Sequence, residues 1–284
     1  MNRTQLILIE GIPGSGKTST AQYIKSLLDT NGVSSQLYLE GDLNHPADYE
    51  SVACLTTREY ESLKDRYPES IHAIDQFTEV NKKQYKLIYY GKLQQQESIE
   101  VNKDLIDELA RFDVYNVSLD LYLELIEERW MEFVKQAQQN QETVILECCF
   151  IQNPITLMFG KHNQTKRSII DFIKRLEQII QPLNPKIIYL YQDDVRTTID
   201  RIIPKRSEEW LKHCIWYFTE QGYGKANSNQ GVEGLCEVLK VRKEYELDIM
   251  NQLRVDKLTF NNTEFNWDAV LEKIRDFLKV NGNC

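Results

Sequence analysis

Residues 11–18 read Gly-Ile-Pro-Gly-Ser-Gly-Lys-Thr and follow an apolar run, Leu-Ile-Leu-Ile, at 6–9. They match the pattern G-x-x-x-x-G-K-[ST] at every fixed position, which is the phosphate-binding P-loop. The apolar run predicts a buried parallel strand over 4–10, and the spacing of apolar residues after the loop predicts a helix over 18–29. A glycine-rich turn that only joins a strand to a helix is the alternative. The full match and both flanks favour an α/β fold that binds nucleotide phosphates.

The residue types of this loop suit a phosphate ligand. Its glycines allow positive φ and let backbone N–H groups come close to phosphate oxygens. Lys17 supplies a positive charge for the β- and γ-phosphates, and the Thr18 hydroxyl is a ligand for Mg²⁺. We therefore predict ATP and Mg²⁺ as cofactors. The nucleotide contacts predicted in the loop and the helix after it are Gly11, Pro13, Gly14, Ser15, Gly16, Lys17, Thr18 and Thr20.

Composition and charge exclude several classes of function. The net charge of −9 over 284 residues argues against a general DNA- or RNA-binding surface, because phosphate backbones select for basic stripes. The chain has no apolar stretch long enough to span a membrane and enters its first strand without a signal-peptide pattern, so we expect a cytoplasmic protein. The six cysteines form no C-x-x-C and no regular spacing, which predicts reduced thiols rather than a zinc site.

Four more strands are predicted further along the chain, at 36–40, 142–147, 186–191 and 255–260. Helical patterns separate the strands, an alternation typical of a parallel sheet. We therefore predict an α/β, three-layer P-loop NTPase fold with a five-stranded parallel sheet. The clearest helices of the second half are predicted at 165–181, 195–203, 233–253 and 267–280.

The stretch from about 47 to 140 breaks this alternation. Apolar residues recur there at three- and four-residue spacing with few strand signals, so we expect a large helical insertion over the phosphate site. Some of its aromatic side chains are candidates for the walls of an acceptor pocket. Because no linker-like segment interrupts the chain, we expect a single domain over 1–284 that contains this insertion. The helices predicted within it cover 49–67, 71–90, 99–111 and 118–139.

Acidic residues follow the second and third predicted strands, at the sheet edge where ligands bind in open α/β folds. Asp42 is the first candidate for a catalytic base and also for a metal ligand, with Glu40 on the same turn as the competing acid. An Asx turn or helix cap is the alternative role for Asp42. Glu147 ends the third strand as a Walker B acid does, which favours contact with Mg²⁺ over a role as an ordinary strand-end residue. The loop formed by 148–150 and 152–154 is a candidate for the lining of the acceptor site.

Basic residues follow the fourth predicted strand. Arg201, Lys205 and Arg206 are spaced to surround a transferring phosphate, so we expect a lid at about 201–230. An exposed basic helix end is the alternative, because helix C-termini attract cations. Asn262, after the last strand, is a candidate contact for the nucleotide base, with an ordinary turn as the equal alternative.

This arrangement resembles the P-loop kinase superfamily, whose members include nucleoside monophosphate kinases, deoxynucleoside kinases, shikimate and gluconate kinases and antibiotic phosphotransferases. The run Gly-Asp-Leu-Asn-His-Pro at 41–46 is similar to the G-D-x-x-H-P run of gluconate kinases, in which the acid faces the acceptor. The resemblance implies that Asp42 orients or deprotonates the acceptor hydroxyl. It also implies that Arg201 and Arg206 correspond to the basic residues of the lid.

The resemblance covers the sheet and its turns but not the region 47–140, which is far longer than in gluconate or shikimate kinases. In addition, Glu147-Cys148 stands where deoxynucleoside and thymidylate kinases have an Asp-Arg pair after the third strand. The identity of the acceptor does not transfer from these families.

The sequence therefore predicts an ATP-dependent small-molecule kinase, which moves the γ-phosphate to a hydroxyl or phosphate of a nucleoside, nucleotide, sugar-like metabolite or antibiotic. A nucleotide-dependent NTPase or switch that acts with a protein partner is the alternative. The expected partner is a small-molecule phosphate acceptor and not a nucleic acid, and a homodimer is the candidate assembly. The residues assigned to catalysis are Lys17, Asp42, Arg201 and Arg206, and those assigned to the metal are Thr18, Glu147 and Asp42.

Overall fold

The computed structural model describes residues 5–96, 102–264 and 266–279. It forms two compact units. The first unit combines Met1–Glu40 with Trp130–Cys284, and the second is Gly41–Arg129. Each unit has its own sheet and its own apolar core, so each is described by itself. The prediction of a single domain with an insertion and a lid stays a prediction.

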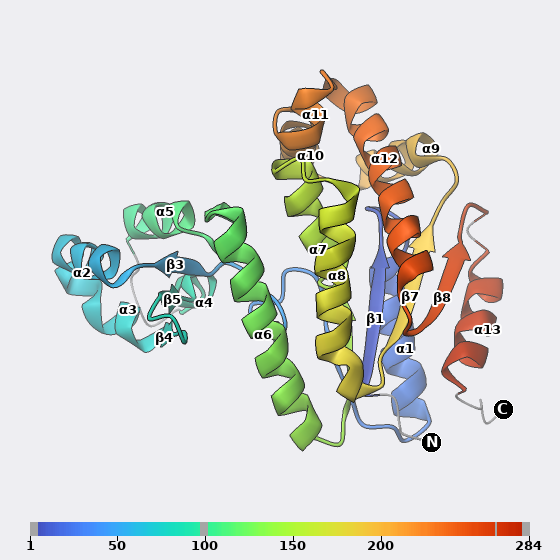
Figure 1. The fold of residues 1–284 in the computed structure, drawn as a ribbon, viewed down its shortest axis with the longest axis horizontal. Helices are drawn as coiled ribbons and strands as arrows, with labels where there is room; N and C mark the ends of the chain where they lie inside the picture. The colour runs from blue at the N-terminus through green and yellow to red at the C-terminus, as the bar shows by residue number, and fades with distance from the viewer. Residues whose placement is uncertain (1–4, 97–101, 265, 280–284) are drawn as a thin grey trace. The chain divides into compact units, whose positions relative to one another are not determined.

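A five-stranded sheet forms the centre of the first unit (Figure 1). Its strands are β1 (Leu6–Gly11), β2 (Ser35–Tyr38), β6 (Thr143–Glu147), β7 (Lys186–Tyr191) and β8 (Asp256–Asn261). They lie in the order β2-β6-β1-β7-β8, and every neighbouring pair is parallel. The predicted α/β class and five-stranded parallel sheet are confirmed.

Strand β1 lies in the middle of this sheet and is buried along its whole length. Leu8 stands in register with Leu146 of β6 on one side and Ile187 of β7 on the other. The chain runs from β1 to one side of the sheet through β2 and β6, and then crosses to the other side through β7 and β8. The carboxyl end of β1 is therefore a topological switch point, where open α/β sheets bind their ligands.

One face of the sheet packs against two helices, α1 (Lys17–Thr30) and α13 (Trp267–Leu278), as Figure 1 shows. Alternate strand residues such as Ile7 and Ile188 meet Ile24 of α1 and Ile274 of α13 in one buried cluster. This face explains the apolar spacing of both helices, because residues three and four apart share one side of a helix.

The opposite face carries α8 (Lys166–Ile180) and α12 (Gly231–Gln252). Helix α6 (Leu119–Gln139) passes from the second unit into the first, where the Trp130 ring contacts Phe150 edge-on with ring centroids 5.7 Å apart. The remaining helical segments of this unit are α7 (Gln152–Ile155), η3 (Thr156–Lys161), η4 (Gln181–Leu183), α9 (Val195–Ile202), η5 (Ile203–Lys205), α10 (Glu208–Thr219) and α11 (Gly222–Ala226).

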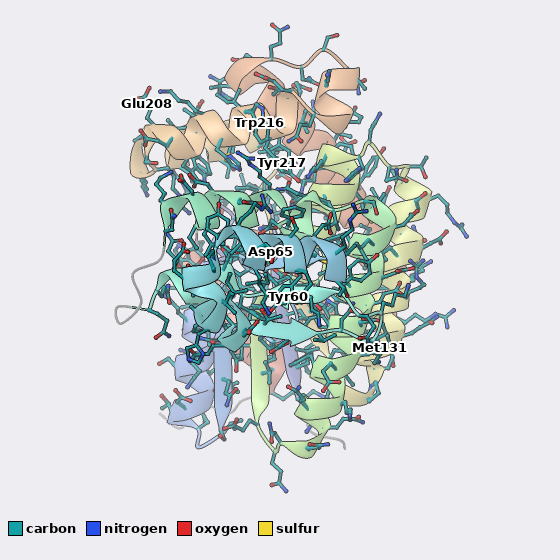
Figure 2. The ribbon with its side chains drawn as sticks, turned by 90° about the vertical axis from the view of Figure 1, so that its left-hand side faces the viewer. Tyr60, Asp65, Met131, Glu208, Trp216 and Tyr217 are labelled. Atoms are coloured by element: carbon teal, nitrogen blue, oxygen red, sulfur yellow. The ribbon has the colours of Figure 1, made fainter. Side chains whose placement is uncertain are left out.

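Helices α10 and α11 occupy the stretch in which the lid is expected. Helix α10 begins at an N-cap, since the Ser207 hydroxyl accepts a hydrogen bond from the Trp210 amide at 3.1 Å. Figure 2 labels Glu208 at its beginning and Trp216 and Tyr217 further along. Trp216 is 47% exposed and lies on the outer surface of this helix, whereas Phe218 is buried.

The second unit is built on a three-stranded antiparallel sheet in the order β3-β5-β4. The helices expected over 49–67 and 71–90 are wrong in part, because strands occupy both stretches. These strands are three residues long, too short for an alternating pattern to show in the sequence. The elements are β3 (Ala53–Leu55), α2 (Thr57–Arg66), η1 (Pro68–Ser70), α3 (Ile71–Gln76), β4 (Thr78–Val80), β5 (Lys86–Ile88), α4 (Tyr90–Gln94), α5 (Lys103–Arg111) and η2 (Val114–Asn116).

Across the described ranges, no helix combines the length and the apolar character that crossing a membrane requires.

We expect Ile188→Ala to lower the free energy of unfolding of the first unit by about 2–5 kcal/mol, because the side chain is fully buried in the central sheet. All four tryptophans belong to this unit, so urea unfolding followed by tryptophan fluorescence reports on it. Thr259→Ala, at an exposed position of β8, should change the same quantity by less than about 0.5 kcal/mol. Equal losses in the two variants would contradict the burial of β7.

Candidate functional site

The P-loop follows the end of β1, and its backbone lies close to residues of β7 and α13. Gly11 has φ 144°, and a Cβ atom there would lie 2.1 Å from the carbonyl oxygen of Leu190. Gly16 has φ 100°, and a Cβ atom would lie 2.3 Å from the Trp267 ring. Only glycine fits both the backbone angles and the space. The loop thus follows the tight, positive-φ backbone path for which its glycines are predicted.

The two polar residues that end the motif begin helix α1. Lys17 is 6% exposed, and its Nζ donates to the carbonyl oxygen of Ile12 within the loop at 3.1 Å. The Thr18 hydroxyl donates to Oε1 of Glu147 at 2.7 Å. Two residues 129 positions apart in sequence, both assigned to the metal, are thus brought into contact. A hydroxyl and a carboxylate are oxygen donors that suit Mg²⁺.

A second carboxylate, that of Glu40, lies beside Glu147. Its Oε1 accepts a hydrogen bond from Nε2 of Gln152 at 3.0 Å, and its backbone N–H points to Oε2 of Glu147 at 3.5 Å. Ligand atoms of Glu40, Glu147 and Cys148 all lie within 4.8 Å of one another. Burial, aided by the nearby acids, raises the pKa of the Cys148 thiol well above its usual range. The carboxylates of Glu40 and Glu147 are oxygen donors, which suit a hard cation such as Mg²⁺.

These groups line a cavity of about 460 Å³ that lies wholly within the first unit. Pro13, Gly14, Gly16, Lys17 and Thr18 form its P-loop wall, and Glu40 and Glu147 stand beside them. The other polar and aromatic walls include Gln152, Asn153, Thr156, Arg206, Trp210, His213, Phe218 and Arg242.

A buried polar network lies beneath this cavity. Arg242 of α12 is 1% exposed, and its Nε donates to Oε1 of Glu246 at 2.7 Å. Its Nη1 donates to the Thr156 hydroxyl at 2.8 Å. Oε2 of Glu246 accepts the Tyr189 hydroxyl at 2.7 Å. Each charge is therefore paired within the network, as burial of ions demands.

A third acid, Glu10, is buried in β1 next to this network. Its two carboxylate oxygens accept the backbone N–H groups of Phe150 and Gln152, both at 2.8 Å. Burial raises the pKa of Glu10 to about 7, and the charge of Glu246 adds to the rise, while the backbone hydrogen bonds oppose it. The carboxylate ties the loop after β6 to the strand that carries the P-loop.

The two arginines assigned to the lid are placed differently. Arg206 lines the cavity, with its guanidinium carbon 5.5 Å from the centroid of the Trp210 ring, a cation–π distance. Arg201, on α9, is not among the residues that line the cavity, and burial lowers the pKa of its guanidinium.

Asn262 and Ser15 are joined, although they are far apart in sequence. The Asn262 side-chain amide donates to the carbonyl oxygen of Ser15 at 3.3 Å, and that of Gln192 donates to the same oxygen at 3.2 Å. Asn262 also borders a second cavity of about 300 Å³. The hydroxyls of Ser15 and Thr20 are buried, with no hydrogen-bond partner among the described residues. Asn262 thus supports the back of the P-loop, and its contact with a nucleotide base stays a prediction.

Asp42 belongs to the second unit, Gly41–Arg129. Its Oδ1 accepts the Asn44 amide at 2.8 Å, and its carbonyl oxygen accepts the His45 amide at 2.9 Å. This is the Asx turn that was the alternative role for this residue. The assignments of Asp42 as catalytic base and metal ligand stay predictions. Within the first unit, the acid beside Thr18 and Glu147 is Glu40.

Sequence reasoning missed Arg242 and the residues of α10 that face the cavity. Arg242 and Glu246 are four residues apart on a predicted helix, which is the pattern of an exposed ion pair. The aromatic run at 216–218 was the available signal in α10, since three adjacent large side chains on one helix cannot all face its core.

Comparison with known proteins adds little to this description. No protein-family model and no curated protein matches the sequence. Among solved structures, the chain is similar to thymidylate kinase from Candida albicans, at 15% identity and a TM-score of 0.40, over 98% of this chain and 93% of that one. The strand order and the geometry of the loop carry the assignment of the fold by themselves. The chain has an α/β P-loop NTPase fold with a five-stranded parallel sheet.

We expect the stability that Glu10 contributes to decrease as pH rises. Its pKa rises from 4.5 to about 7 on folding, so the folded state binds the proton more tightly, and the contribution present below pH 4.5 is lost as pH passes 7. The free energy of unfolding of the wild type relative to Glu10→Gln should fall by about 3 kcal/mol over this range. Urea titrations at a series of pH values measure the difference.

Glu272→Gln, at an exposed position of α13, is the matched control and should give no such slope. A difference between wild type and Glu10→Gln that stays constant with pH would contradict the assignment.

Proposed function

We propose that the protein is an ATP- and Mg²⁺-dependent kinase that phosphorylates a hydroxyl group of a small molecule. The observation that carries this proposal is the Thr18–Glu147 contact at the P-loop, with the Glu40 carboxylate beside it in one cavity. A metal-holding pair and a separate acid next to a phosphate cradle are the parts that phosphoryl transfer needs.

The P-loop residues hold the nucleotide in this proposal. Backbone N–H groups of the loop and Lys17 bind the phosphates. The positive end of the α1 dipole adds to the electrostatic attraction for the negative phosphates. Thr18 and Glu147 would hold Mg²⁺, which would supply positive charge to offset that of the phosphates. Arg206 reaches into the cavity from the turn before α10 and stabilises the charge on the group in transfer.

Glu40 acts as the base in this proposal. The acceptor oxygen forms the new bond to the γ-phosphorus while the bond to the β-phosphate oxygen breaks and ADP leaves, and the hydroxyl proton passes to Glu40. A phosphate acceptor carries no proton that must be removed, and its negative charge would be repelled by Glu40 and Glu147. The pair of acids therefore favours a hydroxyl acceptor over a phosphate acceptor.

The decisive experiment is ADP release from Mg-ATP in the presence of separate pools of nucleosides, sugars, aminoglycosides and nucleoside monophosphates. We expect one hydroxyl-bearing pool to raise ADP release and to yield an acceptor heavier by one phosphate. Lys17→Ala should abolish this release, because its charge on the phosphates is lost. Slow basal hydrolysis that no pool changes would instead support the alternative, a nucleotide-dependent switch that acts with a protein partner.

We expect Glu40→Gln to lower kcat by about 10²- to 10⁴-fold, with a small effect on the KM for ATP, because a general base contributes a factor of this size. Asp42→Asn should change kcat by less than about threefold, since an asparagine oxygen can accept the Asn44 hydrogen bond equally well. Steady-state kinetics with the active pool compare the two variants. The reverse order of effects would assign the base to Asp42.

A further inference from the structure

Gln152, the first residue of α7, makes a directed contact with Glu40. Its side chain is 6% exposed and stands in the wall of the cavity. The amide Nε2 donates to Oε1 of Glu40 at 3.0 Å. Because a carboxylate only accepts hydrogen bonds, the amide nitrogen and not the amide oxygen must face Glu40. The contact therefore fixes the direction of both side chains.

The backbone of Gln152 is held on both sides. Its N–H donates to Oε2 of Glu10 at 2.8 Å. Its carbonyl oxygen accepts the Thr156 hydroxyl at 2.7 Å and Nη2 of Arg242 at 3.4 Å. These partners come from β1, from η3 and from α12, so three elements fix the position of one residue.

The charged groups that hold the Gln152 backbone, and the residues paired with them, are buried. Glu10, Arg242, Glu246 and Tyr189 are each no more than 1% exposed. Arg242 and Tyr189 both donate to the Glu246 carboxylate, at 2.7 Å each. A buried network whose members are all paired gives a rigid base for the side chain above it.

Glu40, in contrast, is exposed and follows the last residue of β2 by two positions. Among the described side chains, its carboxylate is held by the neutral amide of Gln152 at 3.0 Å, and the Cys148 thiol lies at 3.5 Å. A glutamate has several rotamers of similar energy, and a base must stand within hydrogen-bond reach of the proton that it removes.

We propose that Gln152 is a positioning residue, which aims the Glu40 carboxylate at the acceptor hydroxyl and transmits to it the rigidity of the network beneath. This inference rests on the proposed function. Gln152 acts through Glu40 alone in this scheme, so its effect on the rate must disappear when Glu40 can no longer act as a base.

A double-mutant cycle tests the role. We expect Gln152→Leu to lower kcat at least tenfold with the active acceptor pool, while the KM for ATP stays within about twofold, because misplacing a reacting group costs rate. In the Glu40→Gln background, the same substitution should change kcat by less than about twofold. Gln152→Glu is the second variant, and its like charge should lower kcat further than leucine does.

The matched control is Gln136→Leu on α6, where an exposed glutamine amide likewise donates to a glutamate, Oε1 of Glu132, at 3.1 Å. It should leave kcat unchanged. The variants at 152 keep the backbone hydrogen bonds to Glu10 and Arg242, and thermal unfolding checks that they fold.

The outcomes separate the two proposals. Suppose that the wild type shows acceptor-dependent ADP release, and that the fold-loss in kcat from Gln152→Leu multiplies the fold-loss from Glu40→Gln. This result overturns the positioning role and leaves the proposed kinase activity intact. An unchanged kcat in Gln152→Leu does the same. A wild type that no acceptor stimulates overturns the proposed function, and the role of Gln152 falls with it.

Discussion

The hydrogen bonds from the Phe150 and Gln152 amides to the buried Glu10 carboxylate are the interaction on which the site depends. They join the strand that carries the P-loop to the loop that follows the strand ending in Glu147. Parallel strands are aligned by their ladder of backbone hydrogen bonds, but that ladder ends where the loops begin. Beyond it, the Glu10 carboxylate and the Thr18–Glu147 hydrogen bond join the two loops.

Burying an acid in this position has a cost, and backbone hydrogen bonds offset part of it. Two backbone donors stabilise the charged form of Glu10, yet burial still raises its pKa to about 7. Around it, Arg242 pairs with Glu246 within the same layer. Replacing a buried ion pair by apolar side chains often costs no stability, so this pair is weak evidence for stability. Its bearing on the cavity is the hydrogen bonds from Arg242 to the Thr156 hydroxyl and the Gln152 carbonyl oxygen.

The sequence predicted those parts of the site whose chemistry requires particular residue types at fixed spacing. Glycines are needed at 11 and 16 because the loop backbone lies close to Leu190 and Trp267. The P-loop motif already specifies glycine at both positions, so the sequence predicts them. Arg242 and Glu246 could not be recognised, since their spacing on a helix is that of an exposed pair and their burial depends on Tyr189, which is distant in sequence. The three-residue strands of the second unit were hidden for a simpler reason, because a period of two cannot be read from three residues.

The two acids of the cavity differ in what surrounds them, and this difference separates their roles. Oε1 of Glu147 accepts the Thr18 hydroxyl, and Oε2 faces the backbone N–H of Glu40. Contacts on both oxygens hold this carboxylate in place, which suits the metal ligand of the proposed function. The contacts that the structure describes for the Glu40 carboxylate are with neutral groups, the Gln152 amide and the Cys148 thiol. In the proposed scheme, the neutral amide of Gln152 orients Glu40 without neutralising the charge of its carboxylate, while Arg242 contacts the backbone oxygen of Gln152.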